Sequence, residues 1–212
     1  MKAIGFTAVI ASVLYFVSDL VEVVQGRFSD WQLVLTLIAE TAIPVFVVGF
    51  ALVQRPRSLG HPGRLGHLGD FSALAYAYAY LYFTGTVVYA LANGTENYQA
   101  LTERLGSVMT IHGAVMVVAG VGFGYAVLRD RLFPRWTAVA VMVGVVLVAA
   151  AQGLPDGVQL VAAGVRDLGF AGMGVALLRP VHLTQVDDDP WLDLSDRAAL
   201  CGTAVREDSR SG

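Results

Sequence analysis

Six apolar stretches joined by short polar connections constrain the fold of this chain more than any other feature. They cover residues 3–24, 32–53, 71–92, 105–128, 136–152 and 157–178. A helix that crosses the hydrocarbon core of a bilayer needs roughly 20 predominantly apolar residues. The chain is also 56% hydrophobic, which is more apolar surface than a soluble domain of its length needs. The pattern predicts an all-α fold, a polytopic membrane helix bundle of about six transmembrane helices embedded in a lipid bilayer.

The short connections indicate that residues 1–179 form a single domain, the transmembrane helical bundle. Residues 180–212 are polar and are predicted to be a largely disordered cytoplasmic tail. Three aspartates at 187–189 lie in this tail, but Leu192 stands where an aspartate-rich metal motif needs its last aspartate. Cys201 is the single cysteine, so there is no disulfide framework.

The basic residues predict the orientation of the bundle. One side of the membrane would hold Lys2, Arg55, Arg57, Arg64, Arg129, Arg131, Arg135 and Arg179, and the other only Arg27 and Arg104. Cytoplasmic loops carry the excess of Lys and Arg, so both termini are expected in the cytoplasm. Only one of the 14 basic residues is a lysine, which is typical of a GC-rich bacterial genome. We therefore expect an integral protein of a bacterial cytoplasmic membrane.

Ionisable residues inside the predicted spans are the first candidates for function. Such residues are costly in a bilayer and usually face a bundle interior or a water-filled cavity. The candidates are Asp19 and Glu22 in the first span, Glu40 in the second, His112 in the fourth, and Asp156, Gln159, Arg166 and Asp167 in the sixth. At 1.5 Å per residue, most of them fall in the outer half of the membrane. Pairing among these groups to hold the bundle together is the structural alternative to a functional cavity.

Aromatic residues form the second group of candidates. Tyr15 shares one helix face with Asp19 and Glu22, at i, i+4 and i+7. In the third span, one face carries Tyr76, Tyr80 and Phe83, and the opposite face carries Tyr78 and Tyr82. At least one of these faces must look into the bundle. Aromatic faces attract cations, although packing and interface anchoring explain single tyrosines equally well.

Several classes of function are excluded by what the spans lack. His112 is the only histidine within a span, so one chain cannot hold a bis-histidine haem. No lysine lies in a span, which excludes a retinal Schiff base. Zinc-ligand spacing and a phosphate-binding glycine loop are both absent. We therefore expect no cofactor, no metal and no nucleic-acid partner.

Acids, tyrosines and one histidine in an apolar cavity suit the protonation of an apolar substrate. Desolvation disfavours the charged form of a carboxyl, so a buried acid stays protonated and can act as a general acid toward an alkene or epoxide. Glu40 is the expected donor, with Asp19, Asp156, Glu22 and His112 as further catalytic candidates. The aromatic faces would stabilise a carbocation. The substrate-binding candidates are Tyr15, Tyr76, Tyr78, Tyr80, Tyr82, Phe83, Gln159, Arg166 and Asp167.

This small bundle, with acids on separate helices and without an aspartate-rich motif, resembles the small membrane-integral terpene cyclases of fungal meroterpenoid and bacterial drimentine-type pathways. The resemblance spans residues 3–178. It implies metal-independent, proton-initiated cyclisation of a lipophilic farnesyl-type substrate. In that family an acid of an early helix and one of a late helix take part in protonation. Glu40, in Glu40-Thr41-Ala42-Ile43-Pro44, and Asp156 or Asp167 match those positions. The fungal members have seven spans, whereas six are predicted here.

Two other functions fit the same residues. Membrane carboxylates also serve proton-coupled transporters of small molecules, although internal repeats, which many carriers show, are not evident here. A non-catalytic structural or signalling protein would suit the glycine-rich spans. That third interpretation requires the polar groups mainly to pair with each other and to leave no cavity.

Overall fold

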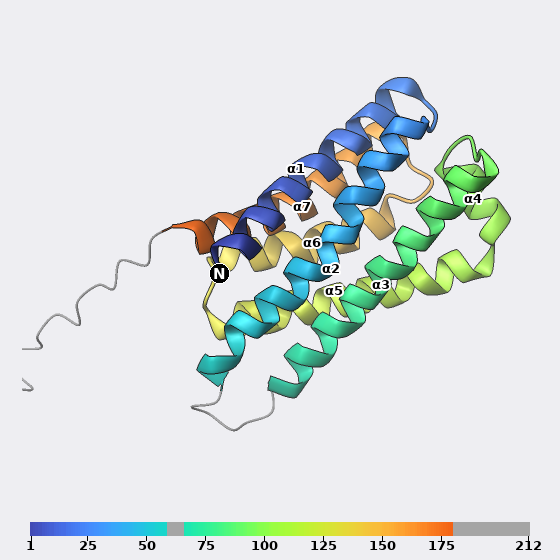
Figure 1. Ribbon diagram of the computed structural model, residues 1–212. Helices are drawn as coiled ribbons and strands as arrows, with labels where there is room; N and C mark the ends of the chain where they lie inside the picture. Colours follow the sequence, from blue (N-terminus) through green and yellow to red (C-terminus); the bar gives the residue numbers. More distant parts are fainter. Residues whose placement is uncertain (59–65, 180–212) are drawn as a thin grey trace, which may run out of the picture. The chain divides into compact units, whose positions relative to one another are not determined.

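A computed structural model of the chain describes residues 1–58 and 66–179, and this part is entirely helical (Figure 1). Its seven helices are α1 (Lys2–Gln25), α2 (Asp30–Ser58), α3 (Gly66–Asn93), α4 (Tyr98–Leu105), α5 (Ser107–Asp130), α6 (Arg135–Ala150) and α7 (Asp156–Leu178). No strand occurs among the described residues. The predicted all-α class is therefore confirmed.

Four helices are long and apolar enough to cross a membrane, namely α1, α2 over Asp30–Gln54, α5 and α7. Helix α6 is apolar but has only 16 residues. Helix α3 has 28 residues, and its tyrosines make it less apolar than the other long helices. The length and composition of the four helices fit a chain that is integrated in a lipid bilayer.

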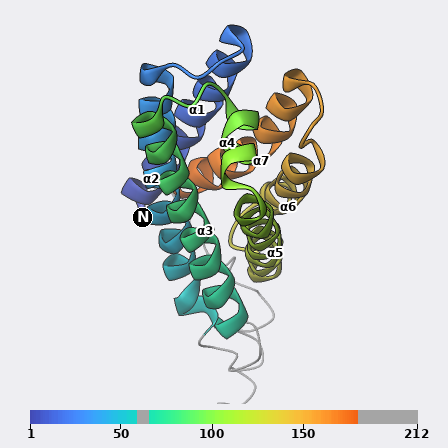
Figure 2. The same ribbon diagram turned by 90° about the vertical axis from the view of Figure 1, so that its right-hand side faces the viewer.

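Six helices form a closed ring in the order α1, α2, α3, α5, α6, α7. Each packs against the next, and α7 packs against α1. Figures 1 and 2 show α4 at the end of the bundle that also holds the α1–α2 and α6–α7 connections, and the N-terminus at the opposite end. We call the first of these the α4 end. Short connections make neighbours in sequence neighbours in the ring, so only the α7–α1 contact joins distant segments.

Helix α4 lies in a connection, 93–104, that the sequence predicted to be a polar loop. The side chain of Asn97 caps it by accepting a hydrogen bond of 2.9 Å from the backbone N–H of Ala100. Leu101 is buried against Leu33, Val87 and Ala90. A helix of eight residues is too short to show a clear apolar period, so its cap and one apolar contact stabilise it.

Glycines set the closest helix crossings. A Cβ on Gly5 would lie 2.7 Å from the carbonyl oxygen of Gly174, so α1 and α7 meet backbone to backbone. Gly144 of α6 lies against the backbone of Arg166 in α7. Small residues allow such close approach between helices in a membrane. Gly120 of α5 lies against Tyr76 of α3 and Val145 of α6, and Gly124 lies against Met142 of α6.

The compact unit of the protein is Met1–Arg179. Its main apolar core fills the half of the ring nearer the N-terminus, where Phe46 of α2 packs against Phe50 at 5.5 Å and against Phe170 of α7 at 5.1 Å between ring centroids. The predictions for the tail, for the aspartates at 187–189, for Cys201 and for Arg64 concern residues outside the described part.

Candidate functional site

The buried charged residues gather at one depth in the ring. Tyr15 of α1, Glu40 of α2 and Arg166 of α7 each lie ten residues from the helix terminus at the α4 end, which is about 15 Å along the axis. The ring order places α2 and α7 on either side of α1. The three side chains therefore meet at mid-depth, and we call them, together with Asp167, the central cluster.

Glu40 is the most deeply buried acid of the central cluster, with 0% of its surface exposed. The hydroxyl of Tyr15 donates a hydrogen bond of 2.9 Å to its Oε1. Its Oε2 is also buried but has no hydrogen-bond partner among the described residues. Buried polar atoms are normally satisfied, so this oxygen is an exception within the central cluster.

Arg166 and Asp167 form a buried ion pair, with Arg166 Nε donating to Asp167 Oδ1 at 2.9 Å. The guanidinium carbon also lies 4.7 Å from the centroid of the Tyr15 ring, which is a cation–π contact. Arg166 Nη2 and Asp167 Oδ2 have no partners within the described ranges. The polar groups of the central cluster therefore pair only in part, and three buried polar atoms are left over.

Two tyrosines of α3 complete the wall of the central cluster. The hydroxyls of Tyr76 and Tyr80 lie 3.4 Å apart, and both side chains are fully buried. Tyr80 interacts electrostatically with Arg166 and Glu40. Tyr78, by contrast, is 68% exposed on the outside of the ring, so the structure does not bring this substrate-binding candidate to the cluster. The expectation that one tyrosine face looks into the bundle is confirmed.

His112 lies nearer the α4 end, in an aromatic stack. Its ring centroid is 4.3 Å from that of Tyr82 and 6.0 Å from that of Phe83. Its Nε2 is buried without a hydrogen-bond partner among the described residues. Phe83 also contacts Tyr98 of α4 at 6.3 Å, and burial raises the pKa of the Tyr98 hydroxyl above its ordinary value. This hydroxyl is therefore neutral at physiological pH.

The remaining predicted acids lead from the α4 end toward the central cluster. Asp156 is exposed and Glu22 and Asp19 are half-buried. Glu22 interacts electrostatically with Asp156, and Asp19 with Asp167. Asp156 thus lies outside the central cluster. Gln159 also lies apart from it, because its side-chain amide donates to the carbonyl of Leu154 at 2.8 Å.

Two features escaped the sequence reasoning. The first is a buried network between α1 and α2. Ser18 and Thr36 share a hydrogen bond of 2.5 Å, and Gln32 Nε2 donates to Ser18 at 3.1 Å and to Thr36 at 3.2 Å. These residues are uncharged, so they did not stand out in apolar spans. These hydrogen bonds indicate a structural role in joining the two helices, and Gln32 Oε1 is the one atom of the network without a partner among the described residues.

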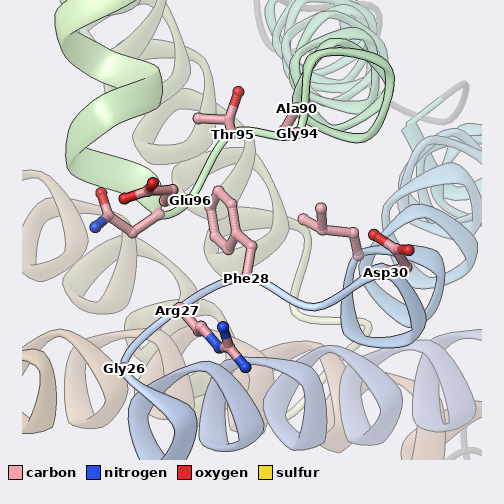
Figure 3. A pocket seen from close by; sticks show the side chains of 10 residues that line it. Gly26, Arg27, Phe28, Asp30, Ala90, Gly94, Thr95 and Glu96 are labelled. Carbon is pink, nitrogen blue, oxygen red and sulfur yellow. The ribbon is translucent and has the colours of Figure 1, made fainter.

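The second feature is a cavity of about 480 Å³ at the α4 end (Figure 3). The α1–α2 connection contributes Arg27 and Phe28, and the α3–α4 connection contributes Thr95 and Glu96. The backbone N–H of Phe28 donates to the carbonyl of Glu96 at 2.7 Å and ties the two connections together. Glu40 does not line this cavity. The cavity is formed by tertiary contact between the two connections, and neither connection carries a sequence motif that predicts it.

No family model, curated protein or solved structure matches the chain.

Proposed function

We propose that the six helices of the ring cross a bacterial cytoplasmic membrane with both termini in the cytoplasm. The α4 end is then external. This orientation is supported by Lys2, Arg129, Arg131 and Arg135 at the opposite end of the bundle and by the positive-inside rule. The 16 residues of α6 span about 24 Å, so this helix runs nearly upright.

Within this bundle the protein is a metal-independent terpene cyclase that protonates an alkene or epoxide of a prenylated, farnesyl-type substrate. The observation that carries the proposal is Glu40, a fully buried carboxyl with one oxygen held by Tyr15 and the other without a partner among the described residues. The resemblance of the spans to small membrane-integral cyclases supports the same choice of acid.

In this reaction the proton of Glu40 Oε2 passes to an alkene carbon or an epoxide oxygen. The alkene π electrons form the new C–H bond, or the epoxide C–O bond breaks, and a carbocation results. A second double bond attacks the cation and closes a ring. Loss of a proton to a carboxylate, or capture by water, ends the sequence. Tyr15 stabilises the Glu40 carboxylate by its hydrogen bond.

The surroundings of Glu40 suit a cationic intermediate. Tyr76 and Tyr80 are buried aromatic rings on α3, and aromatic faces attract cations. Arg166 would repel a carbocation, but its pairing with Asp167 offsets that charge. The side chains at the cluster are tightly buried, so substrate binding requires them to move apart. This movement distinguishes the protein from one with a preformed pocket.

The experiment is an assay of the purified full-length protein with farnesyl and geranylgeranyl compounds in the presence of EDTA. A cyclic product with the mass of the substrate, or with one added water, is the expected result. Glu40→Gln should lower the rate by about 10²–10⁴-fold, the usual contribution of a general acid. Glu103→Gln, a matched change on the exposed surface of α4, should leave the rate unchanged. An active Glu40→Gln protein would remove Glu40 from the mechanism.

Proton-coupled transport is the second candidate, and a specific observation favours it. Burial increases from Asp156 through Glu22 and Asp19 to Glu40, as in a proton path from the α4 end to mid-membrane. Reconstituted vesicles with an imposed pH gradient test this function. Proton flux that Glu40→Gln abolishes, without any cyclic product, would replace the cyclase by a transporter.

A purely structural role fits the tight burial of the central cluster but does not explain its incomplete hydrogen bonding. Such a role requires the polar groups to satisfy one another, whereas Glu40 Oε2, Arg166 Nη2 and Asp167 Oδ2 have no partners in the described part of the chain. Unsatisfied buried polar atoms cost about 1–3 kcal/mol each. If the cluster only held the helices together, these unsatisfied atoms would lower the stability of the bundle without serving a function.

A further inference from the structure

The cavity at the α4 end has the size and lining of a small-molecule site. Its volume of about 480 Å³ falls in the range of roughly 300–1,000 Å³ typical of ligand pockets. One part of its lining is apolar and comes from Phe28, Leu33 and Ala90. The other part carries polar and charged groups from both connections. Such a division suits an amphiphilic ligand with a polar end and an apolar end.

The charged residues of the lining are of both signs and are not paired. Arg27 comes from the α1–α2 connection, Asp30 from the first turn of α2, and Glu96 from the α3–α4 connection. Figure 3 shows Arg27 and Glu96 on different segments around the Phe28 ring. None of the three side chains forms an ion pair with another described residue. All three are exposed at the mouth of the cavity. The cation at Arg27 and the acid at Glu96 complement a zwitterion, with its anion at Arg27 and its ammonium at Glu96.

A buried hydroxyl in the lining also lacks a partner. Thr95 is only 4% exposed, and its Oγ1 has no hydrogen-bond partner among the described residues. Its backbone is held in place, because its N–H donates to the carbonyl of Ala90 at 3.0 Å. A buried hydroxyl is normally satisfied. This oxygen has almost no accessible surface, so it does not contact a ligand in the cavity. Discrimination between a primary and a quaternary ammonium therefore rests on the carboxylates of the lining, which accept N–H hydrogen bonds.

The position of the cavity identifies the source of the zwitterion. Arg27 lies two residues beyond the end of α1 and Asp30 begins α2. Both helices are long and apolar enough to cross a membrane. The adjacent Trp31 is 51% exposed, and exposed tryptophans of membrane proteins gather at the level of the lipid head groups. The cavity therefore lies at head-group depth, whichever way the chain is oriented.

We propose that this cavity is a binding site for the head group of phosphatidylethanolamine. Arg27 binds the phosphate, which an arginine recognises with charge-assisted hydrogen bonds. Glu96 accepts hydrogen bonds from the primary ammonium, whereas Asp30 lies on the other side of the Phe28 ring (Figure 3). Phe28 and Leu33 contact the glycerol and the upper acyl carbons. The site is independent of the chemistry proposed at Glu40, because the two share no lining residue.

Native mass spectrometry of the full chain with three lipids of identical acyl chains tests the site. Phosphatidylethanolamine should be retained about fivefold more than phosphatidylcholine or phosphatidylglycerol, as expected for partly exposed charged contacts. Arg27→Gln and Glu96→Gln should each reduce this preference to none. Arg104→Gln and Glu103→Gln make the same charge changes on α4, outside the lining, and should preserve it. Helical content by circular dichroism verifies that each variant is folded.

Three results would overturn the proposal. Equal retention of phosphatidylethanolamine and phosphatidylcholine by the unmodified protein would show that no primary ammonium is recognised. An equal loss of the lipid preference in Arg104→Gln and Glu103→Gln would show that net surface charge, and not the cavity, causes the preference. Binding of free phosphoethanolamine without any preference among the lipids would make the ligand a soluble zwitterion instead of a lipid.

Discussion

Gly144→Ala tests whether the α6–α7 crossing positions the central cluster. A Cβ added at Gly144 would meet the backbone nitrogen of Arg166, and it would lie 2.5 Å from its Cα and 2.7 Å from its Cβ. Two of these three atoms are backbone atoms of a helix, so no side-chain rotation can relieve the overlap. The substitution must therefore push α6 and α7 apart at the residue that carries the buried guanidinium.

The size of the effect follows from these distances. Carbon atoms pack at about 3.5–4.0 Å, so the two helices must separate by about 1 Å at this crossing. Overpacking a tight core costs about 1–3 kcal/mol, and contact with rigid backbone favours the upper value. Alanine recovers about 1 kcal/mol through its higher helix propensity. The expected net loss is about 2 kcal/mol, accompanied by strain in the 2.9 Å Arg166–Asp167 ion pair.

The assay is unfolding of the purified protein in mixed micelles with increasing dodecyl sulfate, followed by circular dichroism. The matched control is Gly113→Ala in α5, where an added Cβ would have no neighbour within 4 Å. This control should be unchanged or more stable by up to about 1 kcal/mol. If Gly144→Ala proves as stable as Gly113→Ala, the α6–α7 crossing is looser than the structure has it, and the positioning of Arg166 by Gly144 is refuted.

Two further predictions concern the ion pair and the cap of α4. Arg166→Gln should destabilise the protein by about 3 kcal/mol because it leaves Asp167 buried and uncompensated. The double variant Arg166→Gln, Asp167→Asn should recover most of that loss in the same micelle titration. Additive losses of the two single variants would show that the two residues do not interact. Asn97→Ala removes the acceptor for the Ala100 N–H and should cost about 1 kcal/mol of local stability. Faster amide exchange confined to Leu101–Leu105 would reveal it, and unchanged exchange would show that the cap is unimportant.

The sequence alone determined the helical class and the depth of the polar residues. A chain in a bilayer must satisfy its backbone groups within each segment, so long apolar stretches become helices whatever surrounds them. Counting residues along those helices then places Tyr15, Glu40 and Arg166 at nearly the same depth, because the rise per residue is constant. The meeting of these three residues was therefore foreseeable once their helices were known to be close.

The faces of the helices were not foreseeable. Tyr78 and Tyr80 lie in the same alternating run of α3, yet Tyr78 is exposed and Tyr80 is buried in the ring. Periodicity shows which residues share a face. It does not show which face turns inward, because lipid accepts apolar and aromatic side chains as readily as a protein core does. The same limit explains why Tyr78 was predicted to bind substrate.

Only the tertiary structure decided which groups become partners. The closure of the ring by α1 and α7 depends on Gly5 and Gly174, which are too far apart in the sequence for any local pattern to pair them. The bond from Tyr15 to Glu40 depends on the rotation of α1 and α2 about their axes, and the cavity at the α4 end depends on contact between two loops. Local chemistry determines what a segment becomes, whereas partners depend on packing that the whole chain must satisfy together.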